Sequence, residues 1–185
     1  MNPYIEEMME YNDRFVKQEA YRIYRTDKYP STGIAILTCM DTRLTGLLPA
    51  ALHLKNGDVK MIKNAGAFIN DPFSDAVRSL LVGIYELKVN EIMVIGHTEC
   101  GVQGLRGETM LRLMRESGIT EKAIEEVKEQ LPNLTEWLEG FPEVTESVRE
   151  TVTLLKRHPL IPKHVKVGGY LMDVVTGKLT VVDAA

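Results

Sequence analysis

The chain has 185 residues, a formal net charge of −4 and a hydrophobic fraction of 44%. This length suits a single domain with one core over residues 1–185, and the acidic balance excludes the basic face of a nucleic-acid-binding protein. The sequence has no apolar run long enough to span a bilayer, and residues 1–7 lack the basic and apolar regions of a secretory signal peptide. A cytoplasmic protein without a membrane or nucleic-acid partner is therefore expected.

The first 28 residues predict a helical arm, which precedes a body over residues 29–185. An apolar stripe at spacings of i, i+4, i+7 and i+11 predicts a helix over residues 4–20 and consists of Tyr4, Met8, Tyr11 and Phe15. Five of the seven tyrosines lie in the first 29 residues, and aromatic side chains with a polar tip are typical of interfaces. The periodicity is equally compatible with an arm packed on its own body and an arm packed on a partner.

The middle of the chain predicts strands that alternate with helices. The predicted strands are Gly33–Thr38, Val59–Ile62 and Glu91–Ile95. The predicted helices are Leu44–Leu54, ending at Asn56-Gly57, and Ser74–Leu87, with Ser74 as its N-cap. This alternation predicts a parallel sheet with right-handed crossovers. With the strand order 2-1-3, the carboxyl ends of the first and third strands meet at a topological switch point.

The C-terminal part predicts three more helices and two late strands. The helices are Leu105–Glu116, Thr120–Gln130 and Glu143–Arg157, and the strands are Lys166–Val174 and Leu179–Val182. Thr176-Gly177 joins the two strands, which indicates a hairpin or strand at the sheet edge. The expected fold class is α/β, with a mostly parallel central sheet flanked by helices, a late edge hairpin and an N-terminal helical arm.

Two short motifs follow the first and third predicted strands: CMDTR at Cys39–Arg43 and HTEC at His97–Cys100. Together they supply two thiolates and one imidazole, which suits one Zn²⁺ per chain with a fourth position left for water or substrate. The chain has only two cysteines, so a Cys₄ or Cys₃His site is excluded. The alternatives are that each cysteine is a small buried hydrophobe, or that the two form a disulfide, which a reducing compartment disfavours.

The combination of CxDxR and HxxCG, with Lys63-Asn64-Ala65-Gly66 between them, resembles the β-class carbonic anhydrase family from Ile34 to Gly101. The resemblance implies reversible hydration of CO₂ to bicarbonate by attack of zinc-bound hydroxide. It also implies a homodimer or higher homo-oligomer with the arm on the partner. The implied zinc ligands are Cys39, His97 and Cys100, with Asp41 and Arg43 as a dyad beside the metal. Tyr29–Thr32 lacks the pocket glutamine of plant-like members, which indicates the compact prokaryotic branch.

Asp41 and Arg43 are two residues apart, so both can face the same cleft. Arg43 can hold Asp41 in a charge-assisted pair, and an ionised Asp41 can then orient the zinc-bound oxygen. Two alternatives stay open. The pair can be a surface ion pair of little consequence, or Asp41 can turn away from Arg43 and become the fourth zinc ligand.

Asn64, Ala65 and Gly66 follow the second predicted strand, on the same sheet edge as the metal motifs. We expect Gly66 to allow close backbone approach or a positive φ. The amides of this segment could bind an anion such as bicarbonate, although a plain strand-to-loop turn explains it equally well. Phe68 is a candidate wall for an apolar CO₂ pocket or an ordinary core residue. His53 is expected to be a partly exposed helix residue rather than a proton relay.

Two other functions compete with CO₂ hydration. One is a zinc hydrolase on the same scaffold that acts on a CO₂ analogue such as carbon disulfide. The other is a non-catalytic zinc-binding module. Asp41 and Arg43 argue against the module, because a structural zinc site needs neither residue.

Overall fold

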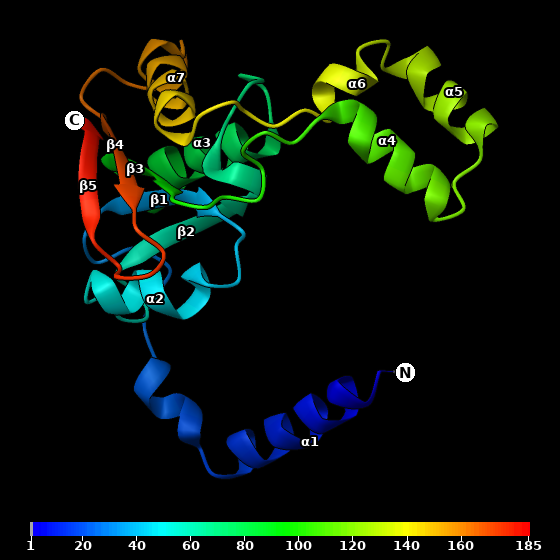
Figure 1. The fold of residues 1–185 in the computed structure, drawn as a ribbon. Coiled ribbons are helices and arrows are strands. Elements are labelled where there is room, and N and C mark those ends of the chain that lie inside the picture. The colour runs from blue at the N-terminus through cyan, green and yellow to red at the C-terminus, as the bar shows by residue number, and fades with distance from the viewer. Residues whose placement is uncertain (1) are drawn as a thin grey trace.

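The computed structural model describes residues 2–185. Its centre is a five-stranded sheet with the order β2-β1-β3-β4-β5 (Figure 1). The strands are β1 (Ile34–Cys39), β2 (Val59–Asn64), β3 (Glu91–His97), β4 (Lys166–Met172) and β5 (Leu179–Asp183). Strands β1 to β4 are parallel, and β5 pairs antiparallel with β4. The mostly parallel α/β fold, the 2-1-3 core and the late edge hairpin are therefore confirmed.

The helices are α1 (Pro3–Lys17), α2 (Leu44–Ala51), α3 (Asp75–Leu87), α4 (Gly107–Glu116), α5 (Glu121–Gln130), α6 (Leu134–Trp137) and α7 (Val144–Arg157), with 3₁₀ turns η1 (Ala20–Tyr24) and η2 (Ala65–Ala67). Helices α3 and α7 pack on one face of the sheet, and α2 packs on the other. Side chains of β1 alternate between the two faces, as a strand requires. Ala35 and Leu37 pack in the core shared with α3 and α7, whereas Ile36 packs in the core shared with α2.

The end of α2 differs from the prediction. The helix ends at Ala51 rather than Leu54. His53 has a φ of 53°, and the N–H groups of His53 and Leu54 donate to the carbonyls of Ala50 and Pro49. These contacts form a Schellman motif, in which a left-handed residue after the helix closes the last turn. The prediction placed this end at Asn56-Gly57 because glycine usually takes the left-handed position, whereas here a histidine does.

Helices α4, α5 and α6 form an appendage that stands away from the sheet (Figure 1). It has its own small core of Leu111, Ile124 and Leu134. Thr120 caps α5 by accepting a hydrogen bond from the N–H of Ala123 at 3.2 Å. The sequence did not predict α6, because a four-residue helix is too short to show a periodicity.

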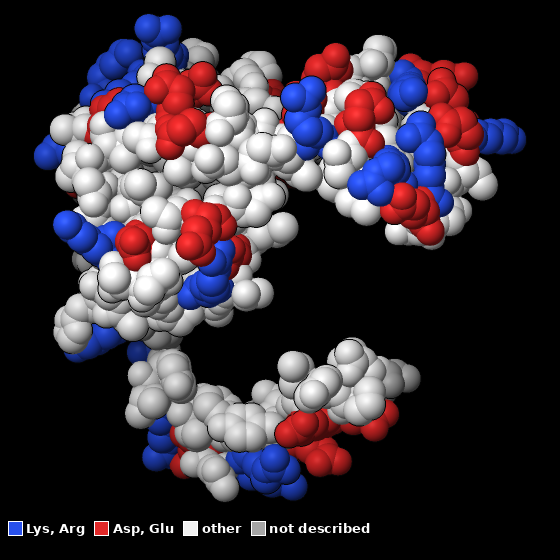
Figure 2. All heavy atoms as spheres, viewed as in Figure 1, with Lys and Arg blue, Asp and Glu red and all other residues white. Residues whose placement is uncertain are grey.

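In the N-terminal arm, α1 lies clear of the body in the described chain (Figure 1), whereas η1 meets the body where the Tyr24 carbonyl accepts a hydrogen bond from Asn56 Nδ2. None of the residues of α1 is buried, and Tyr4, Met8 and Tyr11 of the predicted stripe are exposed. Figure 2 shows the charged side chains of the arm gathered along the edge that faces away from the body. The single chain therefore leaves the apolar stripe uncovered. Within residues 2–185, no helix combines the length and apolar character needed to cross a membrane.

Candidate metal centre

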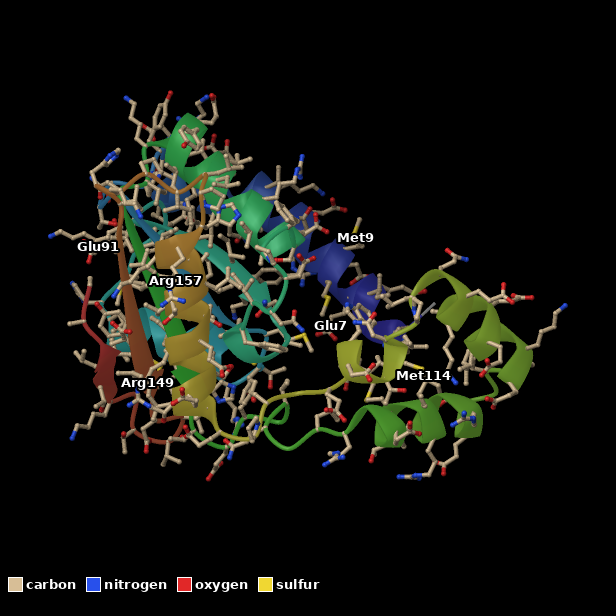
Figure 3. All side chains as sticks on the ribbon, turned by 90° about the horizontal axis from the view of Figure 1, so that it is seen from above. Glu7, Met9, Glu91, Met114, Arg149 and Arg157 are labelled. Atoms are coloured by element: carbon tan, nitrogen blue, oxygen red, sulfur yellow. The ribbon has the colours of Figure 1, made fainter. Side chains whose placement is uncertain are left out.

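The three predicted ligands meet at the carboxyl ends of β1 and β3. Cys39 is the last residue of β1, His97 is the last residue of β3, and Cys100 follows in the next turn. Because β1 and β3 are parallel neighbours, their carboxyl ends lie side by side. The three ligand atoms all lie within 4.8 Å of one another. Figure 3 shows Glu91, at the opposite end of β3 from His97, on the far side of the molecule from Met114 of α4.

The donor set fits a zinc ion. The two sulfur atoms are 4.0 Å apart, and zinc–sulfur bonds of about 2.3 Å in a tetrahedral site place two sulfurs roughly 3.8 Å apart. The Nδ1 atom of His97 lies 2.8 Å from the carbonyl oxygen of Thr98, which can only accept, so the ring proton belongs on Nδ1. The buried Nε2 atom has no hydrogen-bond partner within residues 2–185. A buried lone pair of this kind is costly unless it is satisfied, and a metal ion satisfies it.

The environment of the two sulfurs favours negative charge on Cys39. A hydrogen bond from the Cys100 thiol lowers the pKa of Cys39 and outweighs burial, and His97 and the Gly66 N–H lower it further. The same thiolate neighbour, together with burial, raises the pKa of Cys100. Burial lowers the pKa of His97, but the contacts with Cys39 and the Thr98 carbonyl outweigh it and raise the pKa. The pair therefore favours a thiolate at Cys39, and the thiolate is the form of cysteine that binds a metal ion.

Asp41 lies at the rim of the site and is held by Arg43. The Arg43 Nε and Nη2 atoms donate to the two Asp41 carboxylate oxygens at 3.0 and 2.9 Å, which is a bidentate pair. Side-chain and backbone hydrogen bonds from Arg43 hold the pKa of Asp41 well below its usual range. The Asp41 Oδ2 atom is 3.9 Å from His97 Nε2. Of the two arrangements considered, the structure therefore has Asp41 paired with Arg43.

Glu99 is a charged neighbour of this pair that the sequence analysis did not identify. Its Oε2 atom accepts from Arg43 Nη1 at 3.0 Å, and its backbone carbonyl accepts from Arg43 Nη2 at 3.0 Å. The position of Glu99 inside the HTEC motif, between the ligands His97 and Cys100, is the sequence signal that could have identified it. The contact with Arg43 spans 56 positions of sequence and exists only because β1 and β3 are neighbours.

The predicted substrate segment lies beside Cys39. Gly66 has a φ of 87°, as predicted, and its N–H donates to Cys39 Sγ at 3.3 Å, so this amide is engaged and is not free to bind an anion. Asn64 ends β2 and donates through Nδ2 to the Phe68 carbonyl at 2.8 Å. Phe68 packs edge-to-face on Phe141, with ring centroids 5.5 Å apart. Phe141, which the sequence analysis did not identify, therefore supports the loop beside the metal ligands.

The remaining histidines do not join the site. His53 is exposed after the end of α2. His158 is buried, and its two ring nitrogens contact the Pro72 carbonyl and the Leu160 N–H. His158 therefore joins the end of α7 to the loop before α3.

A parallel α/β sheet with Cys, His and Cys donors at its switch point is the arrangement of a mononuclear metalloenzyme. The family model described as carbonic anhydrase matches residues 34–179. The chain therefore belongs to the carbonic anhydrase family, as the sequence motifs predicted.

Three relatives place the chain within this family. The YvdA protein of Bacillus subtilis (strain 168) is 46% identical over 175 residues, which cover 95% of this chain and 89% of the relative. A crystal structure of β-carbonic anhydrase isoform I from Trichomonas vaginalis superimposes with a TM-score of 0.88 at 34% identity, and covers 100% of this chain and 99% of that one. A carbon disulfide hydrolase of Acidithiobacillus thiooxidans is 32% identical over 78% of this chain and 74% of its own.

Proposed function

We propose that this enzyme reversibly hydrates CO₂ to bicarbonate and a proton, with one zinc ion per chain held by Cys39, His97 and Cys100. The observation that carries the proposal is the buried Nε2 of His97, which has no hydrogen-bond partner within residues 2–185 and lies within 4.8 Å of both sulfurs and 3.9 Å from the Asp41 carboxylate. When bound, zinc lowers the pKa of a coordinated water and so supplies a nucleophile near neutral pH. The relatives of the chain support the same reaction class.

Asp41 and Arg43 are the proposed catalytic residues. An ionised Asp41 can only accept a hydrogen bond, so it would accept a hydrogen bond from the nucleophilic oxygen and direct a lone pair of that oxygen toward the carbon of CO₂. Arg43 holds Asp41 in that orientation through its bidentate contact. Preorganised groups of this kind cost no reorganisation during the reaction.

Asn64, Ala65, Gly66 and Phe68 are the proposed substrate wall. Gly66 allows close approach to the site, because a Cβ at this position would lie 2.7 Å from the Phe141 ring. Phe68 supplies an apolar surface for CO₂, and Asn64 fixes the loop by its contact with the Phe68 carbonyl. A bicarbonate ion leaving the site would pass the same loop.

We propose a homodimer, or a higher homo-oligomer, built from a single domain over residues 1–185. The arm over residues 1–28 would cover its exposed stripe on the body of a partner, residues 29–185. The stripe supports this proposal, because exposed apolar patches of this kind mark interaction sites. A reducing compartment such as the cytoplasm suits two adjacent cysteine ligands, because an oxidising one favours a disulfide.

Zinc content and CO₂ hydration, measured on the same samples, test the proposal. His97→Ala should lose both, whereas His53→Ala removes an exposed histidine outside the site and should keep both. Carbon disulfide hydrolysis is assayed in parallel, since a relative carries that name. Zinc-loaded protein that turns over carbon disulfide and not CO₂ would contradict the proposed substrate, and zinc-loaded protein inactive on both would indicate a binding module.

A further inference from the structure

We infer that Glu99 is a positioning residue, which holds Arg43 in the orientation that pairs with Asp41 and thereby keeps the Asp41 carboxylate away from the fourth coordination position of the metal. The inference rests on the proposed zinc site. It concerns the only carboxylate, among the described residues, that the structure joins to Arg43 besides Asp41.

Asp41 needs to be held because it is a competing ligand. Its Oδ2 atom lies 3.9 Å from the Nε2 atom of His97, and a carboxylate oxygen is an ordinary zinc ligand. A small rotation of the Asp41 side chain would therefore bring it into the coordination sphere, where it would close the position that water and substrate require. Arg43 is the cation that competes with the metal for this carboxylate.

The guanidinium group of Arg43 decides where the second oxygen of Asp41 points. The backbone N–H of Arg43 donates to Asp41 Oδ1 at 2.9 Å, but within the described chain Oδ2 is held only by one edge of the guanidinium group, so its orientation depends on the position of that group. Glu99 anchors Arg43 from another direction, with its carboxylate on Nη1 and its backbone carbonyl on Nη2. Because the guanidinium group is rigid and planar, contacts from two directions define both its position and its plane.

The backbone of Glu99 makes part of this contact, through its carbonyl oxygen. Glu99 has a φ of 54°, a left-handed conformation that is uncommon for residues other than glycine. Alanine carries the same steric cost there as glutamate, so Glu99→Ala removes the carboxylate and leaves the carbonyl contact in place. The Glu99 side chain is 68% exposed, and exposed ion pairs contribute little to folding stability. Its expected effect is therefore on the orientation of Arg43 rather than on stability.

The test compares the zinc-loaded full chain with Glu99→Ala, Glu99→Gln and the control Glu121→Ala. Glu121 makes a similar bidentate contact with Arg115 in the appendage, so its loss removes an ion pair remote from the metal. Zinc release to an excess of chelator is timed without CO₂. A fourth protein ligand should slow release, so we expect Glu99→Ala to slow it about two- to fivefold, the range that one exposed ion pair supports. Glu99→Gln, which keeps one acceptor, should be intermediate, and Glu121→Ala should match the wild type.

Three further measurements extend this test of positioning against a structural role. In an Asp41→Asn background the amide is a poor zinc ligand, so adding Glu99→Ala should leave the release rate unchanged, a coupling that a double-mutant cycle detects. A crystal structure of zinc-loaded Glu99→Ala should show Asp41 turned from Arg43 toward the metal. In the same variant kcat/KM for CO₂ hydration should fall by a factor similar to that for zinc release.

Unchanged zinc release in both Glu99 variants would overturn the inference, as would equal slowing in the Asp41→Asn background. These outcomes are separate from failure of the proposed function. A wild type that binds zinc and does not hydrate CO₂ would refute the function, while slower zinc release in Glu99→Ala would still support the inference.

Discussion

The metal centre and the N-terminal arm differ in how much of their functional surface a single chain buries: the metal ligands are buried within one chain, whereas the apolar stripe of the arm is exposed. At the metal centre, Cys39, His97 and Cys100 are at most 6% exposed, and two of them are fixed by strands that pair with each other. Along α1, Tyr4, Met8 and Tyr11 are 62–69% exposed, and no residue of the helix is buried. A donor set needs only a few atoms within a few ångströms, which one sheet edge supplies, whereas an isolated amphipathic helix needs a second surface to bury its stripe.

The largest effect is expected from a substitution that removes a metal ligand and leaves the arm intact. Cys100→Ser should abolish zinc binding and CO₂ hydration, because two remaining ligands cannot hold the ion as three do. The mass seen by light scattering should be that of the wild type, because the arm is unchanged. Full CO₂ hydration by a metal-free sample would refute the zinc assignment.

Arg43→Ala should lower kcat/KM for CO₂ hydration by about 10²-fold or more, the size of effect seen when a preorganised polar group is lost. Zinc should stay at about one per chain, because Arg43 is not a ligand. Asp41→Asn should likewise keep zinc and lose rate. Stopped-flow assays of CO₂ hydration, with zinc measured on the same samples, test both variants. If either variant kept the wild-type kcat/KM, Asp41 and Arg43 would be only a structural ion pair.

The pH profile sharpens the assignment of Asp41. Because Arg43 lowers the pKa of folded Asp41, the stabilisation from this pair is present above the pKa of unfolded aspartate and is lost only as pH falls through the folded value. Asp41 should therefore stay ionised from about pH 6.5 to 9. The rise of kcat/KM with pH should instead follow an apparent pKa above neutrality, since two thiolates leave the metal less acidifying than three imidazoles do. A profile that is flat over this range would contradict the expectation.

Deleting residues 1–28 should change assembly and leave the ligand set intact. The truncated chain should show a lower mass by light scattering, or aggregate, because surface that the arm covers on the partner becomes exposed. Met8→Lys should weaken assembly by placing a charge in the stripe, while Glu10→Lys changes a charged position of the same helix as a control. An unchanged mass after the deletion would show that the arm is not an interface element.

Gly66→Ala should have the smallest effect, a loss of about 1–3 kcal/mol in the free energy of unfolding, because a residue other than glycine is strained at positive φ. The Cβ would also meet the Phe141 ring. Gly46→Ala is a matched control, since its Cβ would meet no atom within 4 Å. Thermal unfolding of the metal-free proteins measures the difference. Equal melting temperatures for the two variants would show that the loop beside Cys39 adapts without cost.

Much of the fold and the ligand set follows from local sequence. The apolar runs before Cys39 and His97 predict buried strands, and the alternation with helices predicts a parallel sheet, in which the two motifs meet if the strand order is 2-1-3. Both facts depend on residues close together in the chain. The same local signals misplaced the end of α2, because His53 takes a left-handed conformation that the sequence pattern assigns to Gly57.

By itself, the sequence determined the type of each long element and the residues that can hold a metal, because hydrophobic periodicity and donor chemistry are local properties. Tertiary structure alone decided that Arg43 pairs with both Asp41 and Glu99, that the Gly66 amide contacts Cys39, and that Phe141 supports the loop beside it. Most of these contacts join residues far apart in sequence, across neighbouring strands or from the segment before α7 to the loop after β2. The arm shows the same division. Its apolar stripe can be read from the sequence, but only the tertiary structure shows that the body of the same chain leaves the stripe uncovered.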